Sequence, residues 1–268
     1  VLAYQAASAG EKPTNWGDGL WTLHSYEDEV LEMFEGKLRG LLEKLETDKY
    51  ILAFTAPNNF RYSVLPSYKG NRVDKRKPML LGWIKEQAMA THESFLRDDL
   101  EGDDCLGILS TCGRYTDPVI CSIDKDFKTI PGKYYDFGKD VLHDISEAEA
   151  DWWHMYQTLI GDATDGYKGC PGVGPVAAKK ILEQEGDMWT NVVAAFTKAK
   201  LGPEEALVQA RVARTRRAPD YSFTTKKVFL WTPTSKYAPF LGLFPQTTPM
   251  KFHLEPSHPW LRITSLDV

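Results

Sequence analysis

The hydrophobic positions follow two patterns along the chain, and each pattern predicts one kind of element. Apolar residues recur every three or four positions in residues 25–46, which are expected to form one amphipathic helix. Short apolar runs at residues 50–54 and 118–123 predict buried strands. Extended pieces are expected at 127–130 and 134–137, and a polar loop at 10–19. Further helices are expected at 79–95, from about residue 104, and at 146–160, 176–185, 191–200 and 203–217.

The composition limits the class of protein. The chain has 268 residues, of which 43% are hydrophobic and 26% charged, so a soluble globular protein of one large or two modest domains is expected. No apolar run approaches the length that spans a membrane. The four cysteines form no C-x-x-C pair, which argues against zinc, and free thiols fit a reducing cytoplasm. Residues 1–4 resemble the inside of an element, so further residues are expected upstream.

Residues 162–175 combine two kinds of chemistry. Asp162 and Asp165 are three residues apart, a spacing that places both carboxylates on one face of a helical turn, where both reach one cation. Gly172-Val173-Gly174 then forms a tight turn before a helix, whose free N–H groups attract an anion such as phosphate. The alternative is purely structural, because a Gly-x-Gly-Pro turn and an acidic helix start are both common.

Two more acidic groups lie at the ends of predicted elements. Glu101, Asp103 and Asp104 precede a helix, and Asp124 and Asp126 follow a strand. Alternation puts Asp124 and Asp126 on one side of the chain, and ligands of open α/β sheets bind at the carboxyl ends of strands. Solvated caps and an ordinary turn are the alternatives. Together the seven acids predict a site for Mg²⁺ or Mn²⁺, with two ions roughly 3.5–4 Å apart for phosphodiester cleavage.

Basic residues accompany these acids. The segment from Phe60 to Arg72, ending in Lys75-Arg76-Lys77, mixes cations with Tyr68, a combination that suits nucleic-acid phosphates and base stacking, and an exposed basic loop is the alternative. Lys69 and Arg72 would neutralise the scissile phosphate. The four arginines of residues 211–217 predict either a second phosphate-facing surface or a solvated helix face. The net charge of −5 argues against a nucleic-acid partner unless the acids form a metal cluster.

Six motifs occur in a fixed order along the chain. They are Phe60-Arg61, Tyr68-Lys69-Gly70-Asn71-Arg72, Glu101-Gly102-Asp103-Asp104, Ser122-Ile123-Asp124-Lys125-Asp126, Gly161-Asp162-Ala163-Thr164-Asp165-Gly166-Tyr167 and Gly172-Val173-Gly174. Each motif is weak alone, but jointly they resemble the flap-endonuclease and 5′→3′ exonuclease family over roughly residues 1–231. The pattern from Asp151-Trp152-Trp153-His154 to Tyr167 most resembles the 5′→3′ exonucleases of podoviruses.

This resemblance implies an α/β fold of the PIN-like class, with a central, mostly parallel sheet flanked by helices and a helical hairpin region. It implies a nuclease core at residues 1–150, a helical region at 151–231 that completes the metal site, and a tail at 232–268 with no assigned role. The implied activity is removal of nucleotides from DNA 5′ ends, with attack on flaps and on RNA primers paired to DNA. Phage replication in the host cytoplasm is the implied setting.

The resemblance also implies roles for individual residues. Glu101, Asp103 and Asp104 would hold the first divalent ion, and the second would be served, with some ligands shared, by Asp124, Asp126, Asp162 and Asp165. Lys69 and Arg72 would act on the scissile phosphate. The glycine turn would hold the downstream duplex and, in some members, a K⁺. The residues expected to contact DNA are Arg61, Tyr68, Gly172, Val173, Gly174, Lys179 and Lys180.

Two departures from the family pattern bear on activity. An essential Asp is expected just upstream of Val1, and Thr55-Ala56 stand where many members have an Asp. The segment between Arg72 and Glu101 is too short for the long arch of some relatives, which favours attack on DNA ends.

Two other functions stay open. One is a DNA-binding protein that has lost its metals, against which the seven acids argue. The other is a phosphatase of small phosphoesters, in which the glycine turn would have no purpose.

Overall fold

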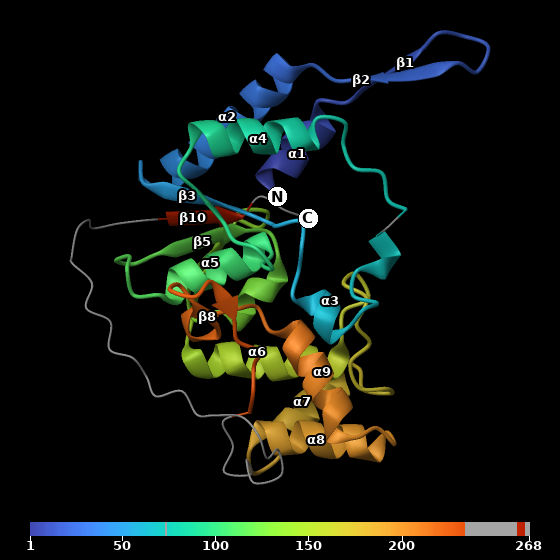
Figure 1. The fold of residues 1–268 in the computed structure, drawn as a ribbon, viewed down its shortest axis with the longest axis vertical. Helices are drawn as coiled ribbons and strands as arrows, with labels where there is room; N and C mark the ends of the chain where they lie inside the picture. The colour runs from blue at the N-terminus through green and yellow to red at the C-terminus, as the bar shows by residue number, and fades with distance from the viewer. Residues whose placement is uncertain (73, 234–261, 266–268) are drawn as a thin grey trace.

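A computed structural model describes residues 1–72, 74–233 and 262–265 of the chain. Within these residues the main sheet has six strands in the order β4-β3-β10-β5-β6-β7 (Figure 1). Neighbouring strands are parallel except β6 and β7, which are antiparallel. The bounds are Ser94–Leu96 (β4), Tyr50–Phe54 (β3), Arg262–Ser265 (β10), Val119–Ser122 (β5), Gly132–Asp136 (β6) and Val141–Ile145 (β7). The predicted α/β class with a mostly parallel sheet is confirmed.

Helices cover both faces of this sheet, because its central strands are apolar on both sides. Side chains alternate along β3, so Leu52 and Phe54 point to one face of the sheet and Ile51 and Ala53 to the other. Burial on both faces makes β3 a continuous apolar run, which is why its sequence predicts a strand. The first face is covered by α1 (Leu2–Ala9), α2 (Glu27–Lys44) and α4 (Leu81–Thr91), and the second by α5 (Gly102–Thr111) (Figure 1).

Four helices form a further region, at the opposite end of the molecule from α2 (Figure 1). They are α6 (Glu147–Ile160), α7 (Pro175–Leu182), α8 (Met188–Lys198) and α9 (Pro203–Ala213). A capping box starts α6, since the Ser146 hydroxyl accepts from the Glu149 N–H and the Glu149 carboxylate accepts from the Ser146 N–H. α6 contributes Met155 and Leu159 to an apolar cluster that also contains residues of α7, α8 and α9. This helix leads the chain to the Asp162–Asp165 turn.

Shorter elements connect these parts. β1 (Lys12–Asn15) and β2 (Trp21–His24) form an antiparallel hairpin that projects from the body, and β8 (Tyr221–Ser222) pairs with β9 (Lys227–Val228) (Figure 1). The remaining described elements are α3 (Arg61–Val64) and the 3₁₀ turns η1 (Gly70–Arg72), η2 (Lys125–Thr129) and η3 (Ala218–Asp220). Of the helices described, none has the length and apolar character needed to cross a membrane.

The structure differs from the sequence prediction at several elements. The helix expected at 79–95 ends at Thr91, and Ser94–Leu96 pairs with β3 instead. Residues 127–130, expected to be extended, lie mostly in η2, which Asp124 caps by accepting from the Asp126 N–H. β1 occupies part of the expected polar loop, and β7 and β10 were not expected, because four or five residues carry little periodicity.

The arginines that follow α9 are buried. Arg214, Arg216 and Arg217 are 6%, 0% and 6% exposed. Arg217 donates to the Thr129 carbonyl at 2.8 Å and pairs with Asp151 at 2.8 Å. Burial lowers the pKa of Arg216 to about 9, which still leaves the side chain charged at neutral pH. The predictions of a phosphate-facing surface and of a solvated face are therefore both wrong for these three residues, whose charges tie the end of α9 to neighbouring elements.

His154 on α6 provides a test of this packing. It is 1% exposed, and its Nε2 donates to the Ala210 carbonyl at 2.8 Å. Burial, and then the charge of Arg214, lower the pKa of His154 well below 6.5. The unfolded chain therefore binds this proton more readily, so stability is lost as the pH falls below about 6.5. In urea denaturation, we expect the wild type to lose about 1.4 kcal/mol more unfolding free energy than His154→Gln between pH 7.5 and 5.5. Parallel losses in both proteins would contradict this.

Candidate active site

Three acidic segments meet at the carboxyl end of β5. Asp124 lies two residues after β5, Glu101 is the N-cap of α5, and Asp165 lies in the turn after α6. Electrostatic interactions cross between the segments, from Asp103 to Asp124 and from Asp124 to Asp165. The fold therefore brings acids from distant parts of the chain into one site, at the sheet edge where ligands of parallel sheets bind.

Cations and an amide contact these carboxylates directly. The contacts join Lys69 to Glu101, Arg72 to Asp165, Lys125 to Asp162 and Gln157 to Asp126, at 2.5, 2.6, 2.8 and 2.5 Å. Among the residues that the structure describes, no three acidic, His or Cys side chains form a group close enough to hold a metal ion. The predicted ligands thus share one site, but groups of the chain itself neutralise several of them.

Asp103 and Asp126 lack a full counter-charge. Asp103 Oδ1 is buried and accepts no hydrogen bond from any described residue. Burial, and then the charges of Asp124 and Glu101, raise the pKa of Asp103 well above its usual value. Burial and Asp124 raise the pKa of Asp126 to about 7. A divalent cation fits these residues, because it would supply positive charge to both carboxylates and a contact for Asp103 Oδ1.

Asp104 has a different environment from its neighbour Asp103. It is 0% exposed, and its two oxygens accept from the Arg61 guanidinium at 2.6 and 2.8 Å. The backbone N–H groups of Glu101 and Arg216 donate to the same carboxylate. Burial alone would raise the pKa of Asp104, but Arg61 and Arg216 outweigh it and lower the pKa. The structure therefore does not support Asp104 as a metal ligand or Arg61, which is 4% exposed, as a DNA contact.

Tyr68 is also buried, which contradicts its predicted stacking on bases. The residue is 2% exposed, and its hydroxyl lies 3.1 Å from Glu101 Oε2 and 3.0 Å from Asp165 Oδ2. The next residue, Lys69, donates its backbone N–H to the Asp165 carbonyl at 2.8 Å. Residues 65–72 therefore join the α5 cap to the turn after α6. The side chains of Lys69 and Arg72 stay partly exposed, at 20% and 25%, and so remain accessible to a phosphate.

Asp162 and Asp165 lie on a turn. Backbone hydrogen bonds pair Asp162 with Tyr167, and Asp162 Oδ1 accepts from the Thr164 N–H at 2.7 Å. Gly161 has φ +69, and a Cβ there would lie 2.4 Å from the backbone of Lys168, so only glycine fits. The prediction that one face of a helical turn joins the two acids is wrong. The turn instead directs Asp162 toward Lys125 and Asp165 toward Arg72.

The glycine turn before α7 is open to solvent. Gly172 has φ +77, and a Cβ at Gly172 or Gly174 would meet nothing within 4 Å. Packing therefore does not require these glycines. The positive φ of Gly172 favours glycine at that position, and a ligand that approaches the backbone closely would require glycine at Gly174. Gly174 caps α7 with Pro175 at its first position, and Lys179 and Lys180 are exposed on the same helix. The turn is thus compatible with its predicted contact to phosphates.

Sequence reasoning missed two residues of the site, Gln157 and Lys125. Gln157 is 5% exposed on the buried face of α6, so a polar residue among apolar positions of an amphipathic helix was the available signal. Lys125 stands between two predicted ligands and reaches Asp162 on another segment, a contact that no local pattern indicates.

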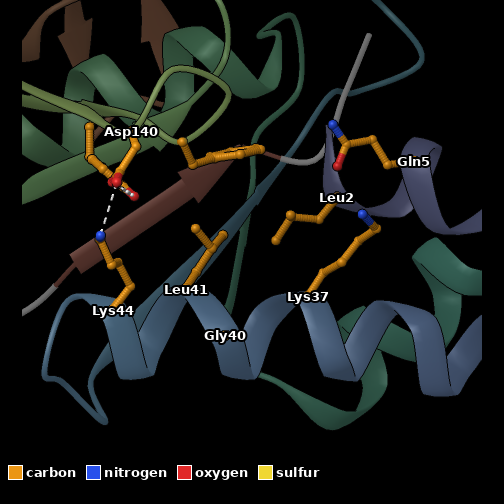
Figure 2. Close-up of a pocket in the computed structure, with 9 residues that line it drawn as sticks. Leu2, Gln5, Lys37, Gly40, Leu41, Lys44 and Asp140 are labelled. Carbon is orange, nitrogen blue, oxygen red and sulfur yellow. Dashed lines mark hydrogen bonds and ion pairs between the residues drawn. The ribbon is translucent and has the colours of Figure 1, made fainter.

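A separate hollow of about 370 Å³ lies between α1, α2 and the end of β6, and none of the candidate site residues lines it. Figure 2 shows Lys37 and Gln5 on one side of this hollow, and Lys44 paired with Asp140 on the other. Tyr135 donates its hydroxyl to the same Asp140 at 2.7 Å.

Two phage nucleases are similar to this chain in sequence. The chain is 30% identical to the exodeoxyribonuclease of Enterobacteria phage T3 over 283 residues, covering 87% of this chain and 91% of the relative. It is also 30% identical to the exonuclease of Escherichia phage T7 over 280 residues, with the same coverage. No protein-family model matches the chain.

Solved structures show the same fold. The D15 protein of phage T5 matches with a TM-score of 0.56 at 17% identity, over 68% of this chain and 80% of that one. A structure of the T5 5′-exonuclease matches with a TM-score of 0.51 at 17% identity, over 68% and 84%. The fold is thus of the PIN-like class, and the identity to the two phage enzymes makes the chain a nuclease of that class. More particularly, the chain belongs to the family of phage exonucleases, as its identity to the T3 and T7 enzymes shows.

The contrast between Asp103 and Asp104 can be measured with one substitution at each position. Asp104→Asn leaves Arg61 buried without its counter-charge, and should lower the free energy of unfolding by about 3–5 kcal/mol. Asp103→Asn removes an unpartnered carboxylate from among like charges, and should leave the stability unchanged or raise it. Urea denaturation at pH 7 with EDTA measures both. Equal destabilisation by the two changes would refute the separate roles.

Proposed function

We propose that this exonuclease hydrolyses DNA phosphodiesters from 5′ ends, with two divalent cations held at the carboxyl end of β5. The observation that carries the proposal is the buried, unpartnered Asp103 Oδ1 among carboxylates from three segments. The T5 structures support it, since one was co-crystallised with metal ions and another contains divalent zinc. A third T5 structure, a flap endonuclease complex with DNA and metal ions, supports DNA as the substrate.

The proposed ligands divide between the segments. Glu101 and Asp103 would hold one cation, and the other would be held, with some ligands shared, by Asp124, Asp126, Asp162 and Asp165. Mg²⁺ or Mn²⁺ suits such carboxylates. When bound, the two cations would activate a water molecule and stabilise the leaving oxygen of the phosphodiester. Asp104 is left out of this set, because both of its oxygens are engaged by Arg61.

Lys69 and Arg72 would bind the scissile phosphate. Both side chains are partly exposed beside the acids. Lys69 forms a salt bridge with Glu101, and Arg72 forms one with Asp165. Their positive charges would hold the phosphate and stabilise the negative charge that develops during hydrolysis. The Tyr68 hydroxyl lies between Glu101 and Asp165, and it would fix these two carboxylates relative to the side chains of Lys69 and Arg72.

The duplex beyond the cleavage site would lie on the helical region. The open glycine turn at 172–174 presents backbone N–H groups at the start of α7, and Lys179 and Lys180 add positive charge beside it. A K⁺ at this turn, and activity on flaps and on RNA primers during phage replication in the host cytoplasm, belong to the same proposal. On this proposal residues 1–150 form the nuclease core and residues 151–231 the DNA-holding region. A DNA-binding protein without catalysis is disfavoured, because such a protein would have no use for a buried acidic site.

A panel of substrates tests the activity. The protein should degrade 5′-labelled duplex, nicked and flapped DNA with Mg²⁺, and EDTA should abolish the reaction. Asp124→Asn should lower the rate at least about 100-fold, as expected for loss of a charged group that holds the cations, while DNA affinity changes little. Gel electrophoresis of the products measures the rate, and filter binding measures the affinity. Cleavage at the wild-type rate by Asp124→Asn, or in EDTA, would refute the proposed site.

The role of the glycine turn is tested by two matched substitutions. Gly172 and Gly113 both have positive φ, +77 and +69, and both have open space at the Cβ position. A valine should therefore strain both backbones alike, at a cost of about 1–3 kcal/mol of stability. Gly172→Val should weaken duplex binding as well, whereas Gly113→Val should not. Duplex affinity that changes equally in both variants would exclude the turn from the DNA contact.

A further inference from the structure

The hairpin β1–β2 projects from the body of the protein on the same side as the chain between η1 and α4 (Figure 1). Its turn is closed by backbone hydrogen bonds, since the Leu20 N–H donates to the Gly17 carbonyl at 2.8 Å and the Trp16 N–H to the Leu20 carbonyl at 2.9 Å. Gly17, Asp18 and Gly19 all have positive φ, at 87°, 48° and 80°. The Gly17 N–H also donates to the Asn15 side chain at 3.0 Å. Such a turn holds the flanking residues in a defined conformation although no core supports them.

This turn presents large apolar side chains to solvent. Trp16, Leu20 and Trp21 are 64%, 60% and 60% exposed. The Trp16 indole N–H donates to Thr22 Oγ1 at 2.7 Å, and Thr22 Oγ1 in turn lies 2.7 Å from His24 Nε2. The polar edge of Trp16 is therefore satisfied within the hairpin while the ring itself is open. An oriented, exposed indole is a platform on which a flat group can stack.

The base of the hairpin is fixed to a basic segment. The Glu11 carboxylate accepts from both terminal nitrogens of Arg76 at 2.6 Å, and from the Met79 N–H at 2.8 Å. Lys75 and Lys77 flank Arg76 and are exposed. Preceding them along the chain are Lys69 and Arg72, which contact the acids of the site. Along the chain, these positive side chains thus connect the site with the base of the hairpin, with the exposed Asp74 as the one acid between them.

We propose that the hairpin binds single-stranded DNA that extends beyond the 5′ side of the cleavage site. Bases would stack on Trp16 and Trp21, and Lys75 and Lys77 would contact the phosphates between the hairpin and the site. Single strands are recognised by this combination, since every base has a face that stacks on an aromatic ring and every linkage carries a negative charge. The inference rests on the proposed function, because it assumes that DNA is the substrate.

Binding by Trp16→Ala tests the inference, measured in an Asp124→Asn background so that no substrate is cut. The probes are a blunt duplex and the same duplex with a 5′ single-stranded extension. Trp16→Ala should weaken binding of the extended duplex about 5-fold to 150-fold and leave blunt-duplex binding unchanged. Trp16→Phe should restore most of the affinity, since another aromatic ring can stack. Lys75→Gln with Lys77→Gln should reduce the salt dependence, the slope of log affinity against log salt, by about 1.4 for the extended duplex only.

Leu142→Ala is the control, since Leu142 is also exposed, at 56%, but lies on β7 away from the hairpin. It should change neither affinity. Unchanged binding of both probes by Trp16→Ala would overturn the inference and point to a protein partner, and an equal loss for both probes would also overturn it. Failure of the parent protein to bind either probe would instead refute the proposed function, so the two failures are distinguishable.

Discussion

Repulsion among carboxylates is the constraint to which the rest of this structure responds. The end of β5, the start of α5 and the turn after α6 meet at one place, and each brings acids with it. Like charges in a partly buried site raise the free energy of the folded state unless positive charge offsets them. Lys69, Arg72 and Lys125 supply that charge at the open edge, and Arg61 supplies it below. Asp103 Oδ1 accepts no hydrogen bond from any described residue.

The pair of Arg61 and Asp104 also joins parts of the chain that are far apart in sequence. Arg61 donates to the carbonyls of Val212 and Arg214 at 3.0 and 2.9 Å, and the Arg216 N–H donates to Asp104 at 3.0 Å. The residues after α9 are thus bound to the start of α5, which positions Glu101 and Asp103. The acids at the end of the sheet can therefore keep a fixed position relative to those after α6. The predicted domain boundary at residue 150 lies between these two groups of acids in the sequence.

The sequence predicted the elements whose apolar pattern is long or continuous, such as β3, α2 and α6. It also predicted which acids gather at the end of β5, because an Asp-Lys-Asp after a buried strand and a Glu-Gly-Asp-Asp before a helix are local signals. It did not separate Asp103 from Asp104, since their difference depends on Arg61, 43 residues away. Burial of Tyr68 and of the arginines after α9 was missed for the same reason. From the sequence alone these polar side chains are expected at the surface, because the residues that bury them are distant along the chain.

Lys69 and Arg72 pair with acids of the site, and on the proposed function they also bind the phosphate of the substrate. In the structure their charges neutralise Glu101 and Asp165, so a phosphate would have to compete with these carboxylates for them. If Glu101 and Asp165 held a cation, as proposed, they would attract Lys69 and Arg72 less strongly, and these two side chains would bind a phosphate more readily. By thermodynamic linkage, phosphate held by Lys69 and Arg72 would then strengthen cation binding by the same factor. On this proposal, Lys69 and Arg72 would bind phosphate well only when cations occupy the acids, and the acids would bind cations best when DNA phosphate is present.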